Sequence, residues 1–506
     1  MDCLRYILAT LIFSVATQAS ATLSADHLND ILQSTGATWT AKENHLSTMQ
    51  RSEVKHLLGL KDSQPTDMGF YVEENMSPRT RQIVDWRNKD GQNYLGPVMD
   101  QANCGSCVAF AATATLEGQV NIASNFPGLN PKFSPQALFS CGGGSCDFGW
   151  FPSSAASFLT KTGIPDEACL PYSSGATGKD VSCSSKCADS TQRSFKIAGS
   201  TTPTSGTTNI QAVKTALEKG PLLTTLTVYE DFMLYSSGVY LHATGPALGG
   251  HAVSLVGYDD TKRAWLIRNS WAKDWGDHGY AWVSWDDKSG IGASTWAFNV
   301  PKGLAISIRE PLTRDYVSGK FNITSEITPG QETQATGEHT MSLSFNGRAV
   351  QNIACAKSMK CSSVIDSTTL ADGKYEVQST AKDSAGNVIR SQTQYFYVLN
   401  HEPQISIALS QKTLTALNSP VKGRVTFEIE NKMSPVPFNR LESIVTKNGA
   451  VIRNRYTEVA VANMAMGWTT TSAPNGEYEI VHMGTVKVGD KVYTAKTQPY
   501  KVTIQN

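Results

Sequence analysis

The 506-residue sequence lacks a surplus of charge of either sign, because 44 aspartates and glutamates balance its 44 lysines and arginines. This balance argues against a protein that coats nucleic acid, since neutralising phosphates requires an excess of cations. The sequence also lacks any stretch of about 18 apolar residues after its N-terminus, so we expect a soluble mature protein without a transmembrane anchor. Hydrophobic residues still make up 40% of the chain, and its length suggests roughly three domains.

Residues 1–21 have the composition of a secretory signal peptide. Arg5 precedes a largely apolar run from Ile7 to Val15, and Ala19-Ser20-Ala21 has the small-x-small form of a signal peptidase site. A buried N-terminal helix is the alternative. We expect export to the periplasm or the cell exterior, which permits disulfides.

The cysteines are odd in number once the signal peptide is removed with Cys3. Of the nine that remain, seven fall between Cys104 and Cys187, and Cys355 and Cys361 stand apart. Six of the seven can pair, which leaves one candidate reactive thiol.

Three regions follow the signal peptide. Residues 22–80 are polar and partly helical, and they end in a Pro- and Ser-bearing stretch typical of a cleavable linker. Residues 81–302 begin with a helical run from Cys107 ("CVAFAATATLEGQVNIA"), and strand-like runs come later ("HAVSLVGYD", "AWLIRNSW", "GYAWVSW"). Helices first and a sheet later predict an α+β domain.

The rest of the chain carries an internal repeat. "FNGRAV" (345–350) recurs as "KNGAVI" (447–452), and residues 372–398 resemble residues 475–502 at an offset of about 103 residues, the size of one β-sandwich. We predict two all-β Ig-like sandwiches, 303–400 and 401–506, with Asn-Gly turns at hairpins. A Cys355–Cys361 disulfide would lie within the first.

Cys104 and Cys107 in "QANCGSCVAF" allow three interpretations. No βαβ unit precedes them, as a thioredoxin-type redox pair would require. A zinc site needs a second pair of ligands, which Cys183-x3-Cys187 could supply, although exported cysteines usually pair with each other. The third interpretation makes Cys107 a nucleophile, whose thiolate the start of a helix would stabilise.

A thiolate nucleophile also needs a proton donor and a group that orients the donor. "GGHAVSLVGYD" offers His251, and "WLIRNSWAKDWGDHGY" offers Asn269, both in or beside strand-like runs. His251 could pair with Cys107, and the Asn269 side-chain oxygen could fix the imidazole tautomer.

In this order, "QANCGSC", "GGHAVSLVGY" and "IRNSWAKDWGDHGY" resemble the papain-like cysteine peptidases over residues 83–300. The resemblance implies a helical lobe and a β-rich lobe with the active site in the cleft between them. It makes Cys107 the nucleophile, His251 the general acid/base and Asn269 its orienting residue.

The same resemblance gives roles to two further residues. Gln101 would donate a side-chain N–H to the oxyanion, together with the backbone N–H of Cys107. Trp271 would shield the His251–Asn269 hydrogen bond from water.

Gly249-Gly250 before His251, and "ACLPY" followed by "CSSKC", resemble the cathepsin B-like branch. This implies the disulfides Cys104–Cys146, Cys141–Cys183 and Cys169–Cys187. "TWTAKENHLSTMQRSEVKHLLG" (38–59) resembles the short propeptide of that branch, which would cross the cleft and inhibit the enzyme until removed.

The sequence departs from the family at three places. Val108 follows the nucleophile where the family usually has Trp, so we expect a smaller side chain in the wall of the site beside Cys107. Phe148-Gly149 stands where Gly-Gly is usual, so Gly149 and Gly250 are expected to offer backbone to an extended substrate while Phe148 narrows the non-primed side. Residues 170–182 contain no histidine, whereas that branch clamps a substrate C-terminus with a His pair, so we expect an endopeptidase.

The sequence therefore predicts an exported cysteine endopeptidase made as a zymogen, acting on protein or peptide substrates through a Cys107 thioester without cofactor or metal. The sandwiches are expected to serve surface attachment or target binding, and their repeat suggests a bacterial protein. The alternative is a non-catalytic adhesin or binding protein on a peptidase-like scaffold, which Val108 and Phe148 leave open.

Overall fold

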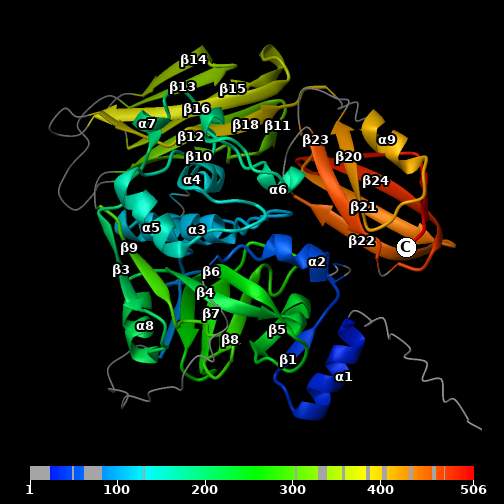
Figure 1. Ribbon diagram of the computed structural model, residues 1–506. Coiled ribbons are helices and arrows are strands. Elements are labelled where there is room, and N and C mark those ends of the chain that lie inside the picture. Colours follow the sequence, from blue (N-terminus) through cyan, green and yellow to red (C-terminus); the bar gives the residue numbers. More distant parts are fainter. Residues whose placement is uncertain are drawn as a thin grey trace, which may run out of the picture.

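The computed structural model describes most of the chain after the predicted signal peptide (Figure 1). The described residues are 23–47, 49, 51–61, 82–127, 129, 131–301, 305–328, 339–355, 359–382, 388–401, 407–431, 437–458, 463–471 and 473–506. The predicted signal peptide and most of the predicted linker lie outside them. Within these residues, no helix is both long enough and apolar enough to cross a membrane.

The N-terminal segment, which we define as the described residues 23–61, forms short elements that run along the rest of the molecule. These are α1 (Ala25–Thr35), β1 (Trp39–Ala41), α2 (Arg51–Val54) and the 3-10 turn η1 (Lys55–Leu57). The α1 helix starts at a Ser24 cap and buries Leu28 and Leu32, which matches the helical spacing of its apolar residues.

A helical lobe follows. Its elements are α3 (Cys107–Ala123), α4 (Pro135–Gly142), α5 (Pro152–Lys161), α6 (Ser174–Thr177), η2 (Cys183–Ser185) and α7 (Ser190–Arg193). The α3 helix begins at Cys107, as predicted. It is buried over most of its length because its own residues are mostly apolar or small on every face.

A nine-stranded sheet forms the second lobe, with α8 (Ile210–Leu217) and η3 (Glu230–Leu234) beside it. The strand order is β1-β5-β8-β7-β6-β4-β9-β3, and β2 pairs with β6. The strands are β2 (Ile83–Asp85), β3 (Gly199–Thr204), β4 (Leu222–Tyr229), β5 (Tyr235–Tyr240), β6 (Ala247–Asp259), β7 (Ala264–Arg268), β8 (Tyr280–Ser284) and β9 (Thr295–Asn299). The α3 helix packs against β6.

The first sandwich, described between residues 305 and 401, has two sheets. One has the order β10-β12-β15, and the other β11-β18-β16-β13-β14 with β17 on β16. The elements are β10 (Ala305–Glu310), β11 (Tyr316–Val317), β12 (Lys320–Thr328), β13 (His339–Phe345), β14 (Arg348–Cys355), β15 (Lys360–Asp366), η4 (Ser367–Thr369), β16 (Gly373–Lys382), β17 (Val388–Arg390) and β18 (Gln394–Val398).

The second sandwich, described between residues 407 and 506, repeats this plan with sheets β19-β20-β23 and β22-β21-β24-β25, with β26 on β24. The elements are β19 (Ile407–Leu409), α9 (Gln411–Leu417), β20 (Arg424–Asn431), β21 (Arg440–Lys447), β22 (Ala450–Thr457), β23 (Asn463–Thr469), β24 (Gly476–Val488), β25 (Lys491–Lys496) and β26 (Tyr500–Ile504). The sequence did not predict α9.

The internal repeat corresponds to equivalent hairpins in the two sandwiches. Asn346-Gly347 joins β13 to β14 with φ of 50° and 76°, and Asn448-Gly449 joins β21 to β22 with φ of 51° and 79°. These positive φ values are the reason that both hairpins use Asn-Gly. The predicted fold class is confirmed, whereas the domain boundaries stay predictions.

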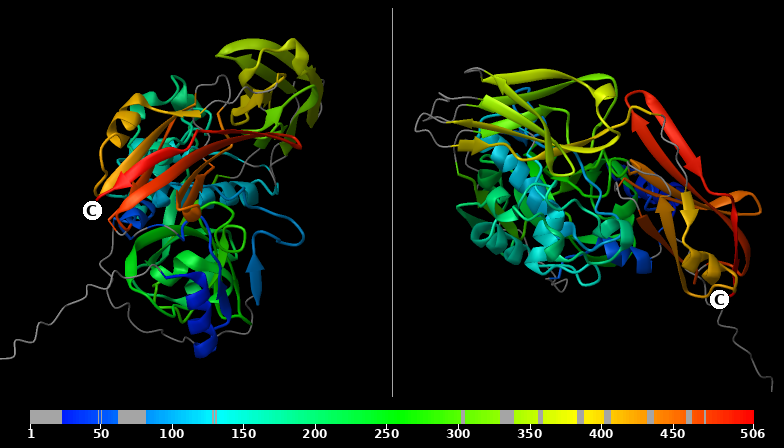
Figure 2. Two further views of the ribbon diagram at one scale, coloured as in Figure 1. Left: turned by 90° about the vertical axis from the view of Figure 1, so that its right-hand side faces the viewer. Right: turned by 90° about the horizontal axis from the view of Figure 1, so that it is seen from above.

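The second sandwich packs on the side of the helical lobe, next to α2 (Figures 1 and 2). Its apolar core is continuous with Phe110 and Tyr172 of the helical lobe. The first sandwich lies across the other side of the helical lobe, where Arg314 pairs with Glu167. The helical lobe is therefore held between the sheet lobe and both sandwiches.

Candidate active site

The predicted nucleophile and base lie on elements that pack against each other. Cys107 is the first residue of α3, is fully buried and carries the free thiol among the cysteines that the structure describes. His251 lies in β6 and is also fully buried. The backbone of Ala252, the next residue of β6, lies close enough to Cys107 to lower the pKa of its thiol, so β6 passes beside the start of α3 next to His251.

The start of α3 leaves backbone donors available around the thiol. Ser106 occupies the N-cap position, but its side chain makes no capping hydrogen bond. Its hydroxyl instead lies 2.8 Å from the Tyr172 hydroxyl, which donates to the Gln101 carbonyl oxygen at 2.7 Å. The first N–H groups of a helix have no intrahelical partner, so those at Cys107 and Val108 are suited to hold negative charge.

Asn269, directly after β7, fixes the protonation of the imidazole. Its Oδ1 lies 2.8 Å from His251 Nε2 and accepts the Ser270 backbone N–H at 2.8 Å. Because this oxygen accepts from Ser270, the hydrogen of the His251 ring belongs on Nε2. Nδ1 is then the basic nitrogen, and it has no hydrogen-bond partner among the described side chains and backbone.

Trp271 covers this hydrogen bond. Its ring stacks on the His251 imidazole with a centroid distance of 4.6 Å and an interplanar angle of 28°. The indole is fully buried, so water does not reach the His251–Asn269 pair from that side. This is the position that the resemblance implied for Trp271.

Gln101 is held with its amide N–H groups directed at carbonyl oxygens. Its Oε1 accepts the Ser270 hydroxyl at 2.7 Å, so its Nε2 is the donor end. Nε2 donates to the Leu57 carbonyl oxygen of the N-terminal segment at 3.0 Å and to the Cys104 carbonyl oxygen at 2.9 Å. A backbone carbonyl of the N-terminal segment thus occupies the place where Gln101 can donate.

The sequence analysis did not single out Ser270, although it stands between two predicted site residues in "RNSW". Its hydroxyl orients Gln101, and its backbone N–H orients Asn269. The signal that could have identified it is this adjacency. The contact of Leu57 with Gln101 had no such signal, because it depends on how the N-terminal segment crosses the lobes.

Residues 59–61 of the N-terminal segment pair with backbone on both sides of the site. The Leu60 N–H donates to the Gly250 carbonyl oxygen at 3.2 Å, and the Trp150 N–H donates to the Gly59 carbonyl oxygen at 2.8 Å. Leu60 and Trp150 form a parallel bridge. The segment is therefore held as an added strand between the loop at Trp150 and β6.

Glycine at position 149 permits this approach. A Cβ at Gly149, whose φ is +71°, would lie 2.1 Å from the Gly59 carbonyl oxygen. Phe148, which was expected to narrow this side, is 73% exposed and so buries little surface against the N-terminal segment. Val108 is fully buried in an apolar cluster with Cys104 and Cys146, so its side chain packs inside the helical lobe.

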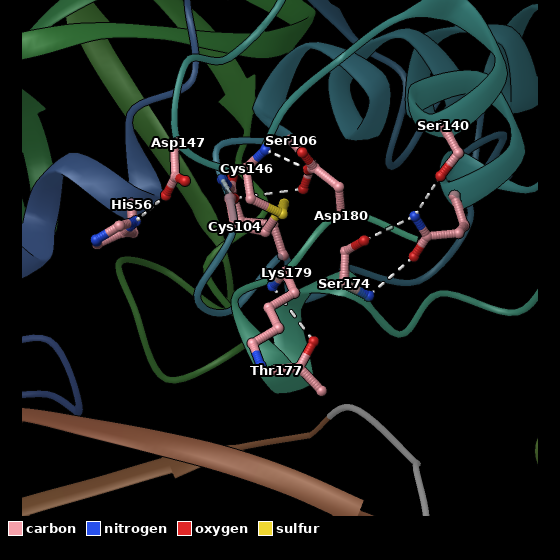
Figure 3. Close-up of a disulfide and its surroundings, with 12 residues drawn as sticks. His56, Cys104, Ser106, Ser140, Cys146, Asp147, Ser174, Thr177, Lys179 and Asp180 are labelled. Atoms are coloured by element: carbon pink, nitrogen blue, oxygen red, sulfur yellow. Dashed lines mark hydrogen bonds and ion pairs between the residues drawn. A yellow bond between two sulfur atoms is a disulfide. The ribbon is translucent and has the colours of Figure 1, made fainter. Parts of the chain in front are cut away.

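The four predicted disulfides are present in the structure. Cys104–Cys146 joins the loop before Cys107 to the loop that carries Gly149, and the Asp180 side chain accepts the Cys146 N–H at 2.6 Å (Figure 3). The other pairs are Cys141–Cys183, Cys169–Cys187 and Cys355–Cys361. Cys104 is therefore not the partner of Cys107, and neither Cys183 nor Cys187 is free to bind zinc.

Burial keeps both reactive groups neutral. It raises the pKa of the Cys107 thiol to about 11, and backbone hydrogen bonds from Ala252 and Gly59 offset only part of the shift. Burial lowers the pKa of His251 to about 4, against the opposing effect of the hydrogen bond to Asn269. A thiolate–imidazolium pair is thus disfavoured while the N-terminal segment covers the site.

Comparison with known proteins finds a family match over the part of the chain that holds this site. The model of the papain family of cysteine proteases matches residues 80–298. Cathepsin B-like CP3 of Giardia intestinalis is 44% identical over 191 residues, which is 36% of this chain and 62% of that protein. The chain thus spans less than two thirds of that relative's length.

Two further relatives are covered more fully. Cathepsin B-like cysteine proteinase 5 of Caenorhabditis elegans is 31% identical over 301 residues, 51% of this chain and 85% of that protein. Digestive cysteine proteinase 2 of Homarus americanus is 34% identical over 237 residues, 45% of this chain and 68% of that protein. The solved structure of proCathepsin B S9 from Trypanosoma congolense has a TM-score of 0.46 and 24% identity, and covers 55% of this chain and 98% of that one.

Proposed function

The chain belongs to the papain family of cysteine proteases, and on this basis we propose that it is an exported cysteine endopeptidase made as a zymogen. One observation carries the proposal. A free, buried thiol begins α3, which packs against the strand β6 that carries an imidazole whose tautomer Asn269 fixes, and the Gln101 amide donates to a backbone carbonyl of the N-terminal segment.

The proposed reaction is peptide-bond hydrolysis in two steps. The Cys107 thiolate attacks the scissile carbonyl carbon, and His251 in its protonated form gives its Nδ1 proton to the leaving amine, which leaves a thioester on Cys107. His251 Nδ1 then takes a proton from a water molecule, whose oxygen attacks the thioester and releases the acid and the thiol. Gln101 Nε2 and the Cys107 backbone N–H would stabilise the oxyanion in both steps.

The N-terminal segment is proposed to be the inhibitory propeptide. Its Leu57 carbonyl oxygen accepts from Gln101, and Gly59 lies against the Cys107 thiol, so it fills the place that a scissile bond needs. Removing this segment would return water to the site, lower the pKa of Cys107 and raise that of His251. The cleavage that releases it is expected in the linker at residues 62–81.

Endopeptidase specificity is proposed because residues 170–182 offer no histidine pair for a substrate C-terminus. Export is proposed from the signal-like N-terminus and agrees with four disulfides. The sandwiches are proposed as accessory modules, on analogy of fold alone. A bacterial origin stays a prediction, since the three relatives named above come from Giardia, a nematode and Homarus.

The alternative, a non-catalytic binding protein, is tested on protein from which the N-terminal segment has been removed. Casein and dipeptidyl-fluorophore hydrolysis is expected, with complete loss in the Cys107→Ala variant and after treatment with a thiol-directed epoxide. An exposed-surface variant, Asn322→Ala in β12, is the matched control and should retain activity. Absence of turnover in the processed wild-type protein would overturn the proposal.

A further inference from the structure

Two arginines of the second sandwich are buried against the N-terminal segment. Arg453, on β22, holds the Glu53 carboxylate of α2 in a two-point ion pair, with Nη1–Oε2 at 2.9 Å and Nη2–Oε1 at 3.2 Å. The Thr469 backbone N–H donates to the same carboxylate at 3.2 Å. Glu53 is only 2% exposed and Arg453 only 4%, so the sandwich has a formed carboxylate site.

Arg455 lies two residues further along β22 and therefore on the same face of the strand. It is buried, and it donates to the Asn103 side-chain oxygen in the loop before the nucleophile. Together with Leu57 and Trp271 it lines a small cavity. Arg455 and the indole that covers His251 thus border the same cavity.

This cavity lies in the leaving-group half of the cleft. The leaving amine takes its proton from His251, so the leaving-group chain must run past His251 and Trp271. Residues 59–61 of the N-terminal segment occupy the opposite half, where they pair with Trp150 and Gly250. The residues before Leu57, including Glu53, accordingly fill the leaving-group half.

The second sandwich has its own attachments to the helical lobe and to the first sandwich, independent of the N-terminal segment. Thr457 donates to the Asp100 side chain at 3.4 Å, and the Tyr316 hydroxyl of the first sandwich donates to the Pro437 carbonyl oxygen at 2.6 Å. The sandwich core is also continuous with Phe110 and Tyr172. Arg453 and Arg455 are thus expected to stay in place when Glu53 leaves.

When Glu53 leaves, Arg453 loses the carboxylate with which it pairs. Two neighbouring guanidinium groups, those of Arg453 and Arg455, then remain. Burial and then Arg453 lower the pKa of Arg455 to about 10, while Glu53 and Asp100 oppose the shift. Guanidinium groups bind carboxylates in a two-point geometry, and a poorly compensated buried charge is costly. The vacated site therefore favours another carboxylate.

We propose that Arg453 and Arg455 form a carboxylate-binding subsite in the leaving-group half of the cleft, which selects substrates that carry an acidic group there. This rests on the proposed peptidase function. Glu53 and Leu57 are four positions apart, which is about 6–8 Å along a helix, and an extended substrate covers that distance in about two residues. The acidic group is thus an Asp or Glu side chain about two residues past the scissile bond, as an endopeptidase requires, or the C-terminal carboxylate of a short leaving group, which would replace endopeptidase by carboxydipeptidase action.

The test uses the full chain after removal of its N-terminal segment, with two pairs of quenched-fluorescence peptides. The first pair carries Glu or Gln at the second position past the scissile bond, with an amidated C-terminus. The second pair has a two-residue neutral leaving group that ends in a free carboxylate or in an amide. A preference in the first pair identifies a side chain, and a preference in the second identifies the terminus.

A charge-assisted hydrogen bond predicts a preference in kcat/KM of about 10- to 100-fold for the acidic member of at least one pair. Arg453→Gln and Arg455→Gln should each bring this ratio towards 1. Lys491→Met, an exposed cation at the far edge of the same sandwich, should leave it unchanged. Equal rates within both pairs would overturn the subsite but keep the peptidase, whereas no cleavage of any peptide would overturn both.

A second measurement avoids arginine variants that fail to fold. A synthetic peptide of residues 45–61 is added to the processed protein as an inhibitor, in its natural form and with Glu53→Gln. The substitution should weaken inhibition about 10- to 100-fold. Equal inhibition by the two peptides would contradict a carboxylate site at Arg453.

Discussion

His251 Nε2 donates a hydrogen bond to Asn269 Oδ1 over 2.8 Å, beneath the ring of Trp271. Because Oδ1 also accepts from Ser270, the amide cannot rotate without losing a second hydrogen bond. The imidazole is thereby held with Nδ1 as its only basic nitrogen. This is the nitrogen that the proposed reaction needs for proton transfer.

Asn269→Ala is expected to lower kcat/KM about 10- to 100-fold in the processed protein. The imidazolium that forms during the reaction would lose a hydrogen bond worth about 1.5–3 kcal/mol. Steady-state kinetics on a dipeptidyl fluorophore measures the effect, with Asn322→Ala as the control. Unchanged kcat/KM would show that the Asn269 contact has no part in catalysis.

Thiol reactivity should depend on whether the N-terminal segment is present. Alkylation requires the thiolate, and the pKa of Cys107 is about 11 in the covered state. The rate with iodoacetamide should therefore rise about tenfold per pH unit up to that value in the unprocessed protein. After the N-terminal segment is removed, the alkylation rate should rise over a lower pH range, because water then reaches the Cys107 thiol and its pKa falls.

Mass spectrometry under native, non-reducing conditions identifies the alkylated residue. Modification is expected at Cys107 and absent in Cys107→Ser. Labelling of Cys104, or one pH profile for both forms of the protein, would contradict this assignment.

Acid should weaken the binding of the N-terminal segment to the active site. His251 has a pKa of about 4 when covered and an ordinary value of 6.5, so the open state binds more protons between these values. Falling pH through this window therefore shifts the balance towards the open state, by up to about tenfold per pH unit. The pKa of His56 is also lowered, chiefly by burial and Arg424, so it acts in the same direction.

Inhibition of the processed protein by the peptide of residues 45–61, measured from pH 7 to pH 4.5, tests this dependence. The inhibition constant should rise as pH falls, and a His56→Gln peptide should retain the part that His251 causes. Inhibition that is constant with pH for both peptides would rule out titration of His251.

The disulfides should differ in what they stabilise. Chain-entropy arguments assign about 4 kcal/mol to a bridge with the Cys104–Cys146 separation of 42 residues and about 2 kcal/mol to the Cys355–Cys361 separation of 6. Replacing the first pair by serine should lower both the free energy of unfolding and activity, because that bridge holds the loop before Cys107. Replacing the second pair should spare activity, as measured by denaturant unfolding and fluorophore hydrolysis.

Local patterns predicted the elements that their own residues determine. The α3 helix starts at Cys107 because the apolar helical run starts there, and the two Asn-Gly turns have the positive φ values expected of them. The short helix α9 was missed, because it is seven residues long and lies within a strand-rich region. A helix of about two turns carries too little periodic pattern to be recognised.

The features of the site likewise divide into residues that local motifs predict and contacts that depend on long-range packing. Cys107, His251 and Asn269 were predicted as site residues because the order of their motifs is specific. The contacts Arg453–Glu53 and Leu57–Gln101 join residues 400 and 44 positions apart, and nothing in the local sequence of either partner predicts them. Such contacts follow from how the second sandwich and the N-terminal segment pack on the helical lobe.

Covalent labelling of the processed protein by a thiol-directed epoxide tests the central claim most directly, when adduct position and casein hydrolysis are followed together. The account predicts one adduct, on Cys107, that forms in step with complete loss of hydrolysis and does not form while the N-terminal segment is in place. An adduct elsewhere, or hydrolysis that continues after Cys107 is fully modified, would contradict it.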